Sequence, residues 1–415
     1  MLDIQFIREN KEKVKKGVAA KQLDPKIVDE LLNVDEKRRK LIVEIEEIRA
    51  KRNQIASEGK PSAAKAMEGK KVKEELKQKE PELSKVEGQY RKALFEIPNP
   101  PAEDVKEGKD ESENEAIRKE GEPKKFDFEA KDHLALGEAL GIIDVERATK
   151  VSGPRFGYLK GDAALLEFAL VNLALETLTK EGFTPVIPPV LIKKEMMGGM
   201  GYLEHGGEED MYVFDKDGLV LIGTSEQSIG PMHANEVLDG KKLPLRYMGF
   251  STCFRRESGS YGKDTRGILR VHQFDKVEMF SFTRPEDSDK EHEFLLGLEE
   301  KLLKAIKIPY QVVKMCSGDL GTPAARKYDL EAWMPGQGKY REVTSTSNTT
   351  DFQARGLNIK YRDGDKLEYV HMLNGTAFAI GRTIIAILEN YQLKDGSVEV
   401  PEVLRKWVGK DKITA

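Results

Sequence analysis

The sequence has 415 residues, a charged fraction of 34% and a formal net charge of −4. A chain of this length predicts two domains, or one large domain with an appendage, and so many charged residues favour long exposed helices over a compact all-β body. The slightly acidic balance excludes a protein that is basic throughout and binds DNA, so any contact with RNA must be local.

Two segments near the N-terminus carry apolar residues at alternating steps of three and four. They span residues 31–55 and 72–97. This heptad spacing is typical of a coiled-coil seam. Between them, residues 57–61 include the helix breakers Gly59 and Pro61, so the chain is expected to reverse there. The sequence therefore predicts two antiparallel helices of ~25–30 residues, which form a rod ~40–45 Å long.

The predicted end of this rod is basic. Eight Lys and Arg residues and only two acidic ones lie from Arg49 to Lys73, and clustered cations attract the phosphates of RNA. A dimerisation or spacer element is the alternative interpretation of the rod. Pro81 falls in the second helix, where it removes a backbone hydrogen bond and costs ~3 kcal/mol, so a kink or an interruption is expected there.

The hairpin is expected to end at the proline-rich residues 98–101. From there to Asp132 the chain carries twelve acidic and seven basic residues, a composition that we interpret as a linker. We therefore divide the chain into an N-terminal, RNA-binding domain over residues 1–105, an acidic linker over 106–132, and a larger, catalytic domain over 133–415.

The larger domain is predicted to contain an antiparallel sheet. Residues 168–178 have the pattern of a helix, and the proline-rich residues 182–189 that follow fit an extended strand at a sheet edge. The turn sequences at 215–218 and 362–365 favour antiparallel strand pairs. Neither the fingerprint of a parallel dinucleotide-binding sheet nor a P-loop is present. The predicted fold class is α+β.

The most informative stretch is residues 254–278. Arg255 and Arg270 are two fixed cations, and Glu257 is a carboxylate that can accept a hydrogen bond from an adenine amino group. Phe274 offers an aromatic face to a purine. An ordinary ion pair between Arg255 and Glu257 is the alternative interpretation, and it would contribute only ~0–1 kcal/mol. Three other segments supply the remaining parts that ATP-dependent activation of a carboxylate requires: 224–226, 342–345 and 374–382.

Together these segments resemble the signature motifs of class II aminoacyl-tRNA synthetases, and the bacterial seryl-tRNA synthetases match best. The resemblance implies a helical hairpin followed by a catalytic domain on an antiparallel β-sheet flanked by helices. It also implies that L-serine is activated with ATP to seryl-adenylate and pyrophosphate, and that serine then passes to the 3′-terminal adenosine of tRNA(Ser). A tRNA(Sec) is a further candidate substrate. Residues 168–189 resemble the class II dimer motif, which implies a homodimer.

The resemblance assigns ATP and Mg²⁺ to particular residues. Arg255 would hold the α-phosphate and the serine carboxylate, and the purine would lie between Phe274 and Arg382. Glu342 and Ser345 offer the hard oxygen atoms that Mg²⁺ shares with ATP phosphates. The predicted catalytic residues are Arg255, Glu342 and Arg382. The predicted ATP-binding residues are Arg255, Arg256, Glu257, Arg270, Val271, Phe274, Glu342, Val343, Thr344, Ser345 and Arg382.

Serine specificity is assigned in the same way. The predicted serine-binding residues are Thr224, Ser225, Glu226, Arg255, Glu278, Asn374 and Thr376. A pocket built to hydrogen-bond a hydroxyl group rejects alanine strongly, whereas threonine must be excluded by shape. No cysteine and histidine set replaces these carboxylates, which argues against a zinc-dependent threonyl enzyme.

The sequence departs from the family pattern at four positions, which are Pro81, Thr346, Gly356 and Ala377. Ala377 stands where a glycine normally follows the pocket hydroxyl, so its methyl group is expected to narrow the pocket or to shift the backbone of Thr376. Two other functions stay open. They are a catalytically silent tRNA-binding paralogue, and an amino-acid:carrier-protein ligase, for which the basic hairpin would be superfluous.

The remaining chemistry is predicted to be structural. Cys253 and Cys316 suit neither a disulfide framework nor a metal cluster, and they are expected to be buried thiols. The histidines, His133 among them, are expected to be structural or surface residues. No apolar run is long enough for a signal peptide or a membrane span, which predicts a cytoplasmic protein that contacts no membrane.

Overall fold

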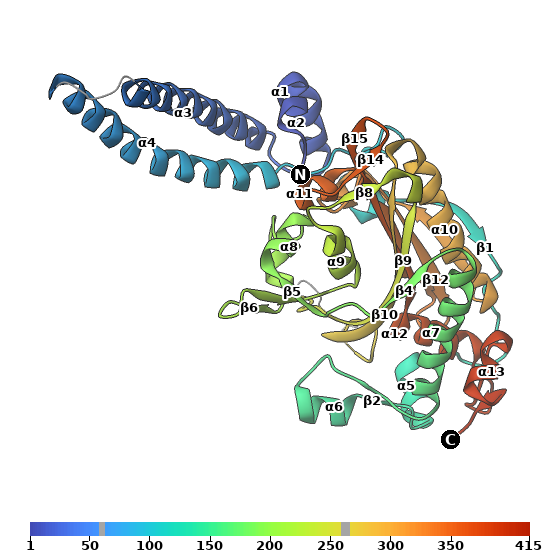
Figure 1. The fold of residues 1–415 in the computed structure, drawn as a ribbon. Helices are drawn as coiled ribbons and strands as arrows, with labels where there is room; N and C mark the ends of the chain where they lie inside the picture. The colour runs from blue at the N-terminus through green and yellow to red at the C-terminus, as the bar shows by residue number, and fades with distance from the viewer. Residues whose placement is uncertain (58–62, 259–265) are drawn as a thin grey trace. The chain divides into compact units, whose positions relative to one another are not determined.

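A computed structural model describes residues 1–57, 63–258 and 266–415, with the side chains of residues 63–66 excepted. The chain divides into two compact units, Met1–Pro98 and Asn99–Ala415 (Figure 1). Each unit is described by itself below. In the described part of the chain, no helix combines the length and the apolarity needed to cross a membrane.

The first unit confirms the predicted helical hairpin. It consists of α1 (Ile4–Glu9), α2 (Lys11–Ala20), α3 (Lys26–Ser57) and α4 (Ala63–Phe95). The two long helices lie side by side (Figure 1), and with 32 and 33 residues they are longer than predicted. Their seam is apolar and includes Ile45, Ile48, Val72 and Leu76. The predicted reversal at 58–61, Lys60 and the side chain of Lys65 lie outside the described residues.

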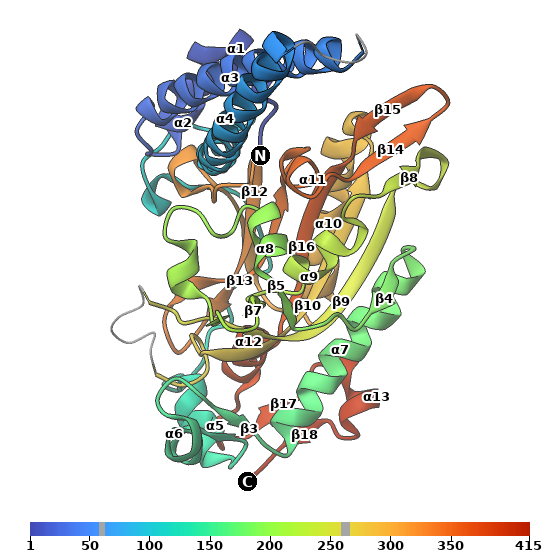
Figure 2. The ribbon, with the colours of Figure 1, turned by 60° about the vertical axis from the view of Figure 1, so that its left-hand side comes forward.

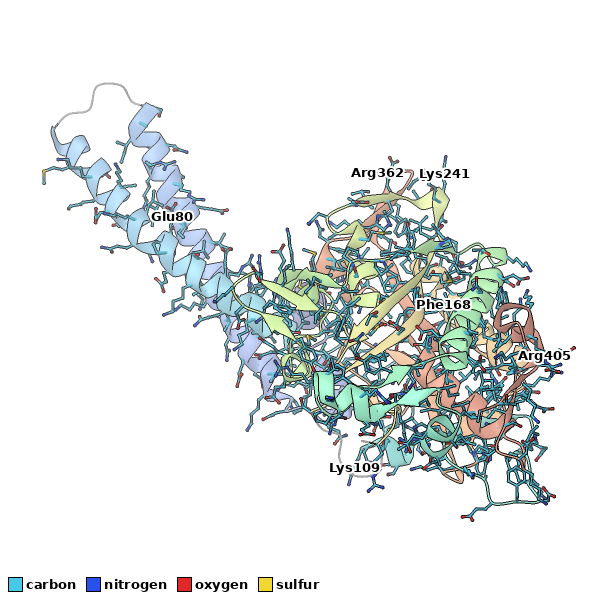
Figure 3. The ribbon with its side chains drawn as sticks, turned by 90° about the horizontal axis from the view of Figure 1, so that it is seen from below. Glu80, Lys109, Phe168, Lys241, Arg362 and Arg405 are labelled. Atoms are coloured by element: carbon cyan, nitrogen blue, oxygen red, sulfur yellow. The ribbon has the colours of Figure 1, made fainter. Side chains whose placement is uncertain are left out.

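Pro81 does not interrupt α4, so of the two outcomes expected there, a kink or an interruption, the interruption was wrong. Pro81 is exposed. Water can therefore donate to the backbone carbonyl that lacks its usual N–H partner. The seam residues Leu76 and Val86 are buried on either side of it. Ion pairs also join the helices, for example Arg49 with Glu80 at 2.8 Å (Figure 3). These contacts hold the helix through the position where a hydrogen bond is lost.

The second unit is built on the predicted antiparallel sheet, which has eight described strands (Figure 2). Among these strands only the pair of β4 with β9 is parallel. The order across the sheet is β1 (Glu115–Glu120), β11 (Tyr310–Lys314), β12 (Arg326–Met334), β13 (Lys339–Asn348), β16 (His371–Ala379), β10 (Gln273–Thr283), β9 (Leu245–Phe254) and β4 (Thr184–Val186).

Smaller elements surround this sheet. The short sheets pair β2 (Ile143–Asp144) with β3 (Tyr158–Leu159), β5 (Leu191–Lys193) and β6 (Val213–Phe214) with β7 (Leu219–Leu221), β8 (Val237–Asp239) and β15 (Lys366–Tyr369) with β14 (Lys360–Asp363), and β17 (Val398–Glu399) with β18 (Lys412–Ile413). The short helices are α5 (His133–Ala139), α6 (Val145–Ser152), α8 (Lys194–Gly199), α9 (Glu226–Ile229), α11 (Phe352–Leu357) and α13 (Arg405–Val408). The predicted turns at 215–218 and 362–365 do join antiparallel strands.

The acidic segment 106–132 is not only a linker. Residues Glu115–Glu120 form β1, which pairs with β11 at one edge of the large sheet. The composition gave no indication of this strand because all six of its residues are exposed and most of them are charged. Charged side chains on an edge strand discourage pairing with other chains, so an acidic and basic edge is compatible with a folded protein.

One face of the large sheet is covered by three helices, α7 (Asp162–Lys180), α10 (Ser288–Ala305) and α12 (Ile380–Tyr391). Strand β10 shows how this arrangement leaves the other face for chemistry. Val277 and Met279 lie in the core beneath the helices, while Phe274, Lys276 and Glu278 line a cavity. Because side chains alternate along a strand, this stretch of β10 turns Val277 and Met279 to the core and Phe274, Lys276 and Glu278 to the cavity.

Candidate active site

The cavity has a volume of about 420 Å³ and is lined by residues of β10, β13, β16 and α12, together with the segments around Thr224 and Arg255. Almost all of the predicted site residues border it, although they come from distant parts of the sequence. Those that do are Thr224, Glu226, Arg255, Glu257, Arg270, Val271, Phe274, Glu278, Glu342, Val343, Thr344, Ser345, Asn374, Thr376 and Arg382.

Two predicted residues do not border the cavity. The Nε of Arg256 donates to the carbonyl of Met211 at 2.7 Å, and its guanidinium group lies 5.2 Å from the ring centre of Tyr212. Neighbouring side chains of an extended segment point in opposite directions, so Arg256 faces away when Arg255 faces inward. Ser225 is buried, and its hydroxyl donates to the carbonyl of Gly249 at 3.4 Å.

Two further predicted residues turn their side chains to the core. Val343 packs in the apolar core under the helices, and the hydroxyl of Thr344 donates to the Glu299 carboxyl of α10 at 2.9 Å. Glu342 and Ser345, on either side of them, also border the cavity and carry oxygen atoms in their side chains.

Arg255 is held in place before any ligand binds. Its backbone N–H donates to the carbonyl of His272 at 3.0 Å, and its Nε donates to the carbonyl of Gly223 at 3.1 Å. Its guanidinium carbon lies 5.3 Å from the ring centre of Phe274. A planar cation fixed in this way presents its remaining donors to the cavity, which suits a bidentate contact with a phosphate or a carboxylate.

A second cation of the cavity, Arg270, pairs with Glu257. The distance from its Nη1 to the carboxylate is 3.3 Å. Glu257 adopts a left-handed backbone conformation with a φ of 52°, and its carbonyl accepts from Arg155 at 2.8 Å. The predicted adenine-reading carboxylate and the predicted phosphate-binding arginine are therefore neighbours.

Arg382 of α12 forms the third cation, and it pairs with Glu342 of β13 at 3.1 Å. Burial alone would raise the pKa of Glu342, but the charges of Arg382, Lys327 and Arg255 lower that pKa to about 2. Glu342 is therefore a carboxylate at neutral pH, and with the Ser345 hydroxyl it forms a hard oxygen donor set of the kind that Mg²⁺ prefers. The described residues contain no group of three or more His, Cys, Asp and Glu side chains that could hold a metal ion by themselves.

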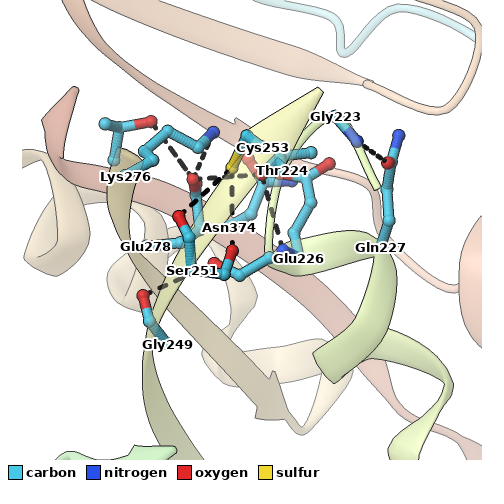
Figure 4. Close-up of polar contacts among 12 residues, drawn as sticks. Gly223, Thr224, Glu226, Gln227, Gly249, Ser251, Cys253, Lys276, Glu278 and Asn374 are labelled. Carbon is cyan, nitrogen blue, oxygen red and sulfur yellow. Dashed lines mark hydrogen bonds and ion pairs between the residues drawn. The ribbon is translucent and has the colours of Figure 1, made fainter. Parts of the chain in front are cut away.

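An acidic cluster around Glu226 and Glu278 also lines the cavity, and its polar contacts are drawn in Figure 4. Glu278 is 1% exposed and forms an ion pair with Lys276. Its carboxylate also accepts from the hydroxyls of Thr224 at 3.1 Å and Thr376 at 3.4 Å. Here two carboxylates and two hydroxyls surround one space, an arrangement that can hold a small ligand with both an ammonium and a hydroxyl group.

Glu226, the second carboxylate, accepts from the Tyr202 hydroxyl. Burial and then the charge of Glu278 raise the pKa of Glu226 to about 7. Two carboxylates that crowd one another in a buried site favour an added cation, because that cation relieves their repulsion.

Sequence reasoning missed Lys276 and Tyr202, which both line the cavity. Lys276 had a usable signal, because it lies two residues from both Phe274 and Glu278 on the same strand and must share their face. Tyr202 had none, since it reaches Glu226 from a turn that follows α8.

The other three departures from the family pattern have structural explanations as well. Ala377 is fully buried in the core under the helices, so the expectation that its methyl group would narrow the pocket was wrong. Thr346 is also buried, and its hydroxyl donates to the carbonyl of Asn374 at 2.8 Å. At Gly356 an added Cβ would lie 2.0 Å from the carbonyl oxygen of Gly199, so only glycine fits.

Comparisons with known proteins place both units of the chain in one family. Residues 1–101 match the family model of the seryl-tRNA synthetase N-terminal domain, and residues 212–391 match that of the tRNA synthetase class II core domain (G, H, P, S and T). The serine--tRNA ligase of Dictyoglomus turgidum is 47% identical over 421 residues, which cover 100% of this chain and 99% of that protein.

Two solved structures are similar along the whole chain. The seryl-tRNA synthetase of Pyrococcus horikoshii, complexed with ATP, has a TM-score of 0.92 and 43% identity, with 100% of this chain and 99% of that one covered. The cytoplasmic serine-tRNA ligase of Naegleria fowleri, in complex with AMP, has a TM-score of 0.88 and 36% identity with the same coverage. Both the N-terminal hairpin and the catalytic core are thus matched, and the chain belongs to the seryl-tRNA synthetase family.

Proposed function

We propose that this protein activates L-serine with ATP to seryl-adenylate and then transfers serine to the 3′-terminal adenosine of tRNA(Ser). The observation that carries the proposal is that one cavity is lined both by three arginines, Arg255, Arg270 and Arg382, and by an acidic, hydroxyl-bearing cluster around Glu278. Family membership over the full chain supports it.

Adenylate formation needs alignment and positive charge rather than a covalent intermediate on the enzyme. The serine carboxylate attacks the α-phosphorus of ATP and pyrophosphate leaves. Arg255 lies on the cavity wall where it can bind both the carboxylate and the α-phosphate, which lowers the barrier by orientation and by charge stabilisation. Arg270 and Arg382 bind the distal phosphates, and Phe274 with Arg382 encloses the purine.

Mg²⁺ fits the donor set on β13. Glu342 and Ser345 would hold it together with phosphate oxygens of ATP, and when bound the ion neutralises phosphate charge. Glu342 stays ionised for this purpose because three cations lower its pKa. Since two protein oxygens are too few to retain the ion, the metal enters with the nucleotide.

The acidic cluster around Glu226 and Glu278 selects the amino acid. Glu226 and Glu278 receive the ammonium group, and Thr224, Thr376 and Asn374 form the side that receives the hydroxyl. An amino acid without a hydroxyl leaves these buried groups without a partner, so alanine is rejected. Lys276 offsets part of the charge of Glu278 when the pocket is empty.

The tRNA is held by the first unit. Six of the predicted basic residues are exposed near the connected ends of α3 and α4, namely Arg49, Lys51, Arg52, Lys70, Lys71 and Lys73. They bind phosphates of tRNA(Ser), and a tRNA(Sec) with a similar shape is a second substrate.

The protein acts as a homodimer in the cytoplasm. Helix α7 exposes Phe168 to 60% (Figure 3) and Leu165 to 40%, and Ile187, just beyond the edge strand β4, is 87% exposed. Large apolar side chains that cluster on a helix and a sheet edge favour burial against a second copy of the same surface.

Serine-dependent ATP–pyrophosphate exchange tests the proposal, with threonine, alanine and glycine measured beside it. Exchange with serine alone, followed by serylation of tRNA(Ser), is the expected result. Silence with all four amino acids would favour the catalytically silent paralogue, and exchange without any transfer to tRNA would favour the carrier-protein ligase.

A further inference from the structure

The segment 267–271 poses a structural question. It carries Arg270 and Val271 to the cavity and leads into β10, yet it contains neither helix nor strand. Ile268, Leu269 and Val271 are buried, so the segment is anchored rather than loose. Regular backbone pairing does not hold it, and its position must depend on contacts with other parts of the chain.

One of these contacts comes from His133, the first residue of α5. The backbone N–H of Ile268 donates to Nε2 of His133 at 3.4 Å. Gly267 has a φ of 71°, and a Cβ built there would lie 2.2 Å from the same Nε2 atom. The imidazole, which is 7% exposed, therefore lies directly against the backbone of this segment.

Glu389 holds the backbone of His133 and lies beside its imidazole. It is fully buried on α12, and its carboxylate accepts from the backbone N–H groups of His133 at 3.1 Å and Gly336 at 2.9 Å. The same oxygen that meets the His133 N–H lies 3.5 Å from Nδ1. Nδ1 makes no hydrogen bond among the described residues. A neutral imidazole can accept at Nε2 only when its hydrogen is on Nδ1, and the negative charge of the nearby carboxylate favours that tautomer.

We propose that His133, held by Glu389 through its backbone N–H, is a positioning residue that sets the backbone of 267–271 and thereby places Arg270 in the ATP site. Glu389 lies on the same helix as Arg382. Helix α12 therefore places one phosphate-binding arginine directly and the other through His133. The role of Arg270 rests on the proposed function, whereas the anchoring of the segment does not.

The test compares His133→Ala with His133→Gln and with a matched control, His292→Ala. His292 is also fully buried, but it lies on α10 and packs 5.1 Å from the ring of Tyr328, away from this segment. In ATP–pyrophosphate exchange, His133→Ala is expected to raise the KM for ATP about tenfold, equivalent to about 1.4 kcal/mol, and to leave the KM for serine within twofold. The glutamine variant, whose side-chain oxygen can accept from Ile268, should recover part of this loss.

Amide hydrogen exchange supplies a readout that needs no catalysis. Peptides that cover 267–271 should exchange about tenfold faster in His133→Ala and only slightly faster in His133→Gln, with no change in His292→Ala. If His133→Ala does not fold, His133→Gln and Glu389→Gln carry the same comparison, with smaller changes in the same direction. Equal changes in the KM for ATP and for serine would overturn the proposal. Unchanged amide hydrogen exchange at 267–271 would overturn it as well. If the protein activates no amino acid, the proposed function is refuted. The amide hydrogen exchange result then decides whether His133 positions the segment 267–271.

Discussion

At the scale of the residue, Arg255 is the side chain on which the proposed activation most depends. The carbonyl of Gly223 and the ring of Phe274 hold its guanidinium group, so its remaining donors are oriented in advance. Lysine at this position keeps the charge but loses the planar fork. We expect Arg255→Lys to lower kcat in ATP–pyrophosphate exchange by roughly 10²-fold, the usual effect of losing one oriented donor.

Thermal unfolding is the control for that variant. Because the guanidinium group of Arg255 lines the cavity and is not part of the apolar core, the melting temperature of Arg255→Lys should stay near that of the parent protein. A variant that keeps full activity would show that charge alone is needed at this position, and would remove the argument from bidentate binding.

Glu226 makes a prediction about stability and pH. Burial and the charge of Glu278 raise its pKa from 4.5 to about 7. A carboxyl group whose pKa is raised by folding contributes stability that is fully present below its unfolded pKa and is lost as the pH rises through the folded value. Between pH 4.5 and 8 the parent protein should therefore lose up to about 3 kcal/mol relative to Glu226→Gln, because a tenfold change in proton affinity corresponds to about 1.4 kcal/mol.

Urea unfolding of both proteins at several pH values measures this difference. The same comparison made with Glu399→Gln, a partly exposed acid on β17, controls for the general effect of removing one negative charge. A difference between parent and Glu226→Gln that does not change with pH would show that folding does not raise the pKa of Glu226.

At the scale of the element, the periodicity of a pattern decided what could be predicted. The heptads of α3 and α4 were visible because most residues at alternating steps of three and four are apolar over residues 31–55 and 72–97. The motif residues on β10 were visible through chemistry. What one-dimensional reasoning could not provide was the direction of each side chain, so Arg256 was assigned to the cavity and Lys276 was overlooked. Strand β1 was missed because an exposed edge strand has no apolar face to reveal it.

Two departures from the family pattern, Ala377 on β16 and Gly356 on α11, test which way each side chain faces. Ala377 faces the core, so Ala377→Gly should leave the KM for serine and the rejection of threonine within twofold. It should also lower the free energy of unfolding by about 1–2 kcal/mol, through the lost methyl group and the freer backbone. Steady-state exchange kinetics and urea unfolding of the same preparation measure both effects.

Gly356→Ala provides the contrasting case. The added Cβ would meet the Gly199 carbonyl oxygen at 2.0 Å, and because that oxygen belongs to the backbone the clash cannot be relieved by a side-chain rotation. We expect a loss of about 1–3 kcal/mol in the free energy of unfolding. If Ala377→Gly instead changed the KM for serine severalfold, the methyl group would have to influence the pocket through Thr376 after all.

At the scale of the whole molecule, the proposed function assigns RNA binding and activation chemistry to different units of the chain. The residues of the cavity all belong to the unit Asn99–Ala415, while the basic cluster belongs to Met1–Pro98. Exposed cations on a helix pair contribute to affinity for a polyanion without any pocket, whereas activation requires one. The two activities should therefore respond to separate mutations, and deleting residues 27–97 should abolish tRNA charging while adenylate formation is largely kept.

A charge change tests this separation without removing a folded element. The triple variant Lys70→Ala, Lys71→Ala, Lys73→Ala takes three exposed cations from the start of α4, and Lys85→Ala, Arg91→Ala, Lys92→Ala takes three exposed cations from its other end. Each phosphate contact that is lost should reduce the slope of log affinity against log salt by about 0.9. The first variant should raise the KM for tRNA tenfold or more and flatten its salt dependence, with ATP–pyrophosphate exchange unchanged, and the second should do neither. Equal effects from both triple variants would mean that net charge, and not the position of the basic residues, attracts the tRNA. Unchanged tRNA charging by the first triple variant would refute the assignment of the hairpin as the tRNA-binding element.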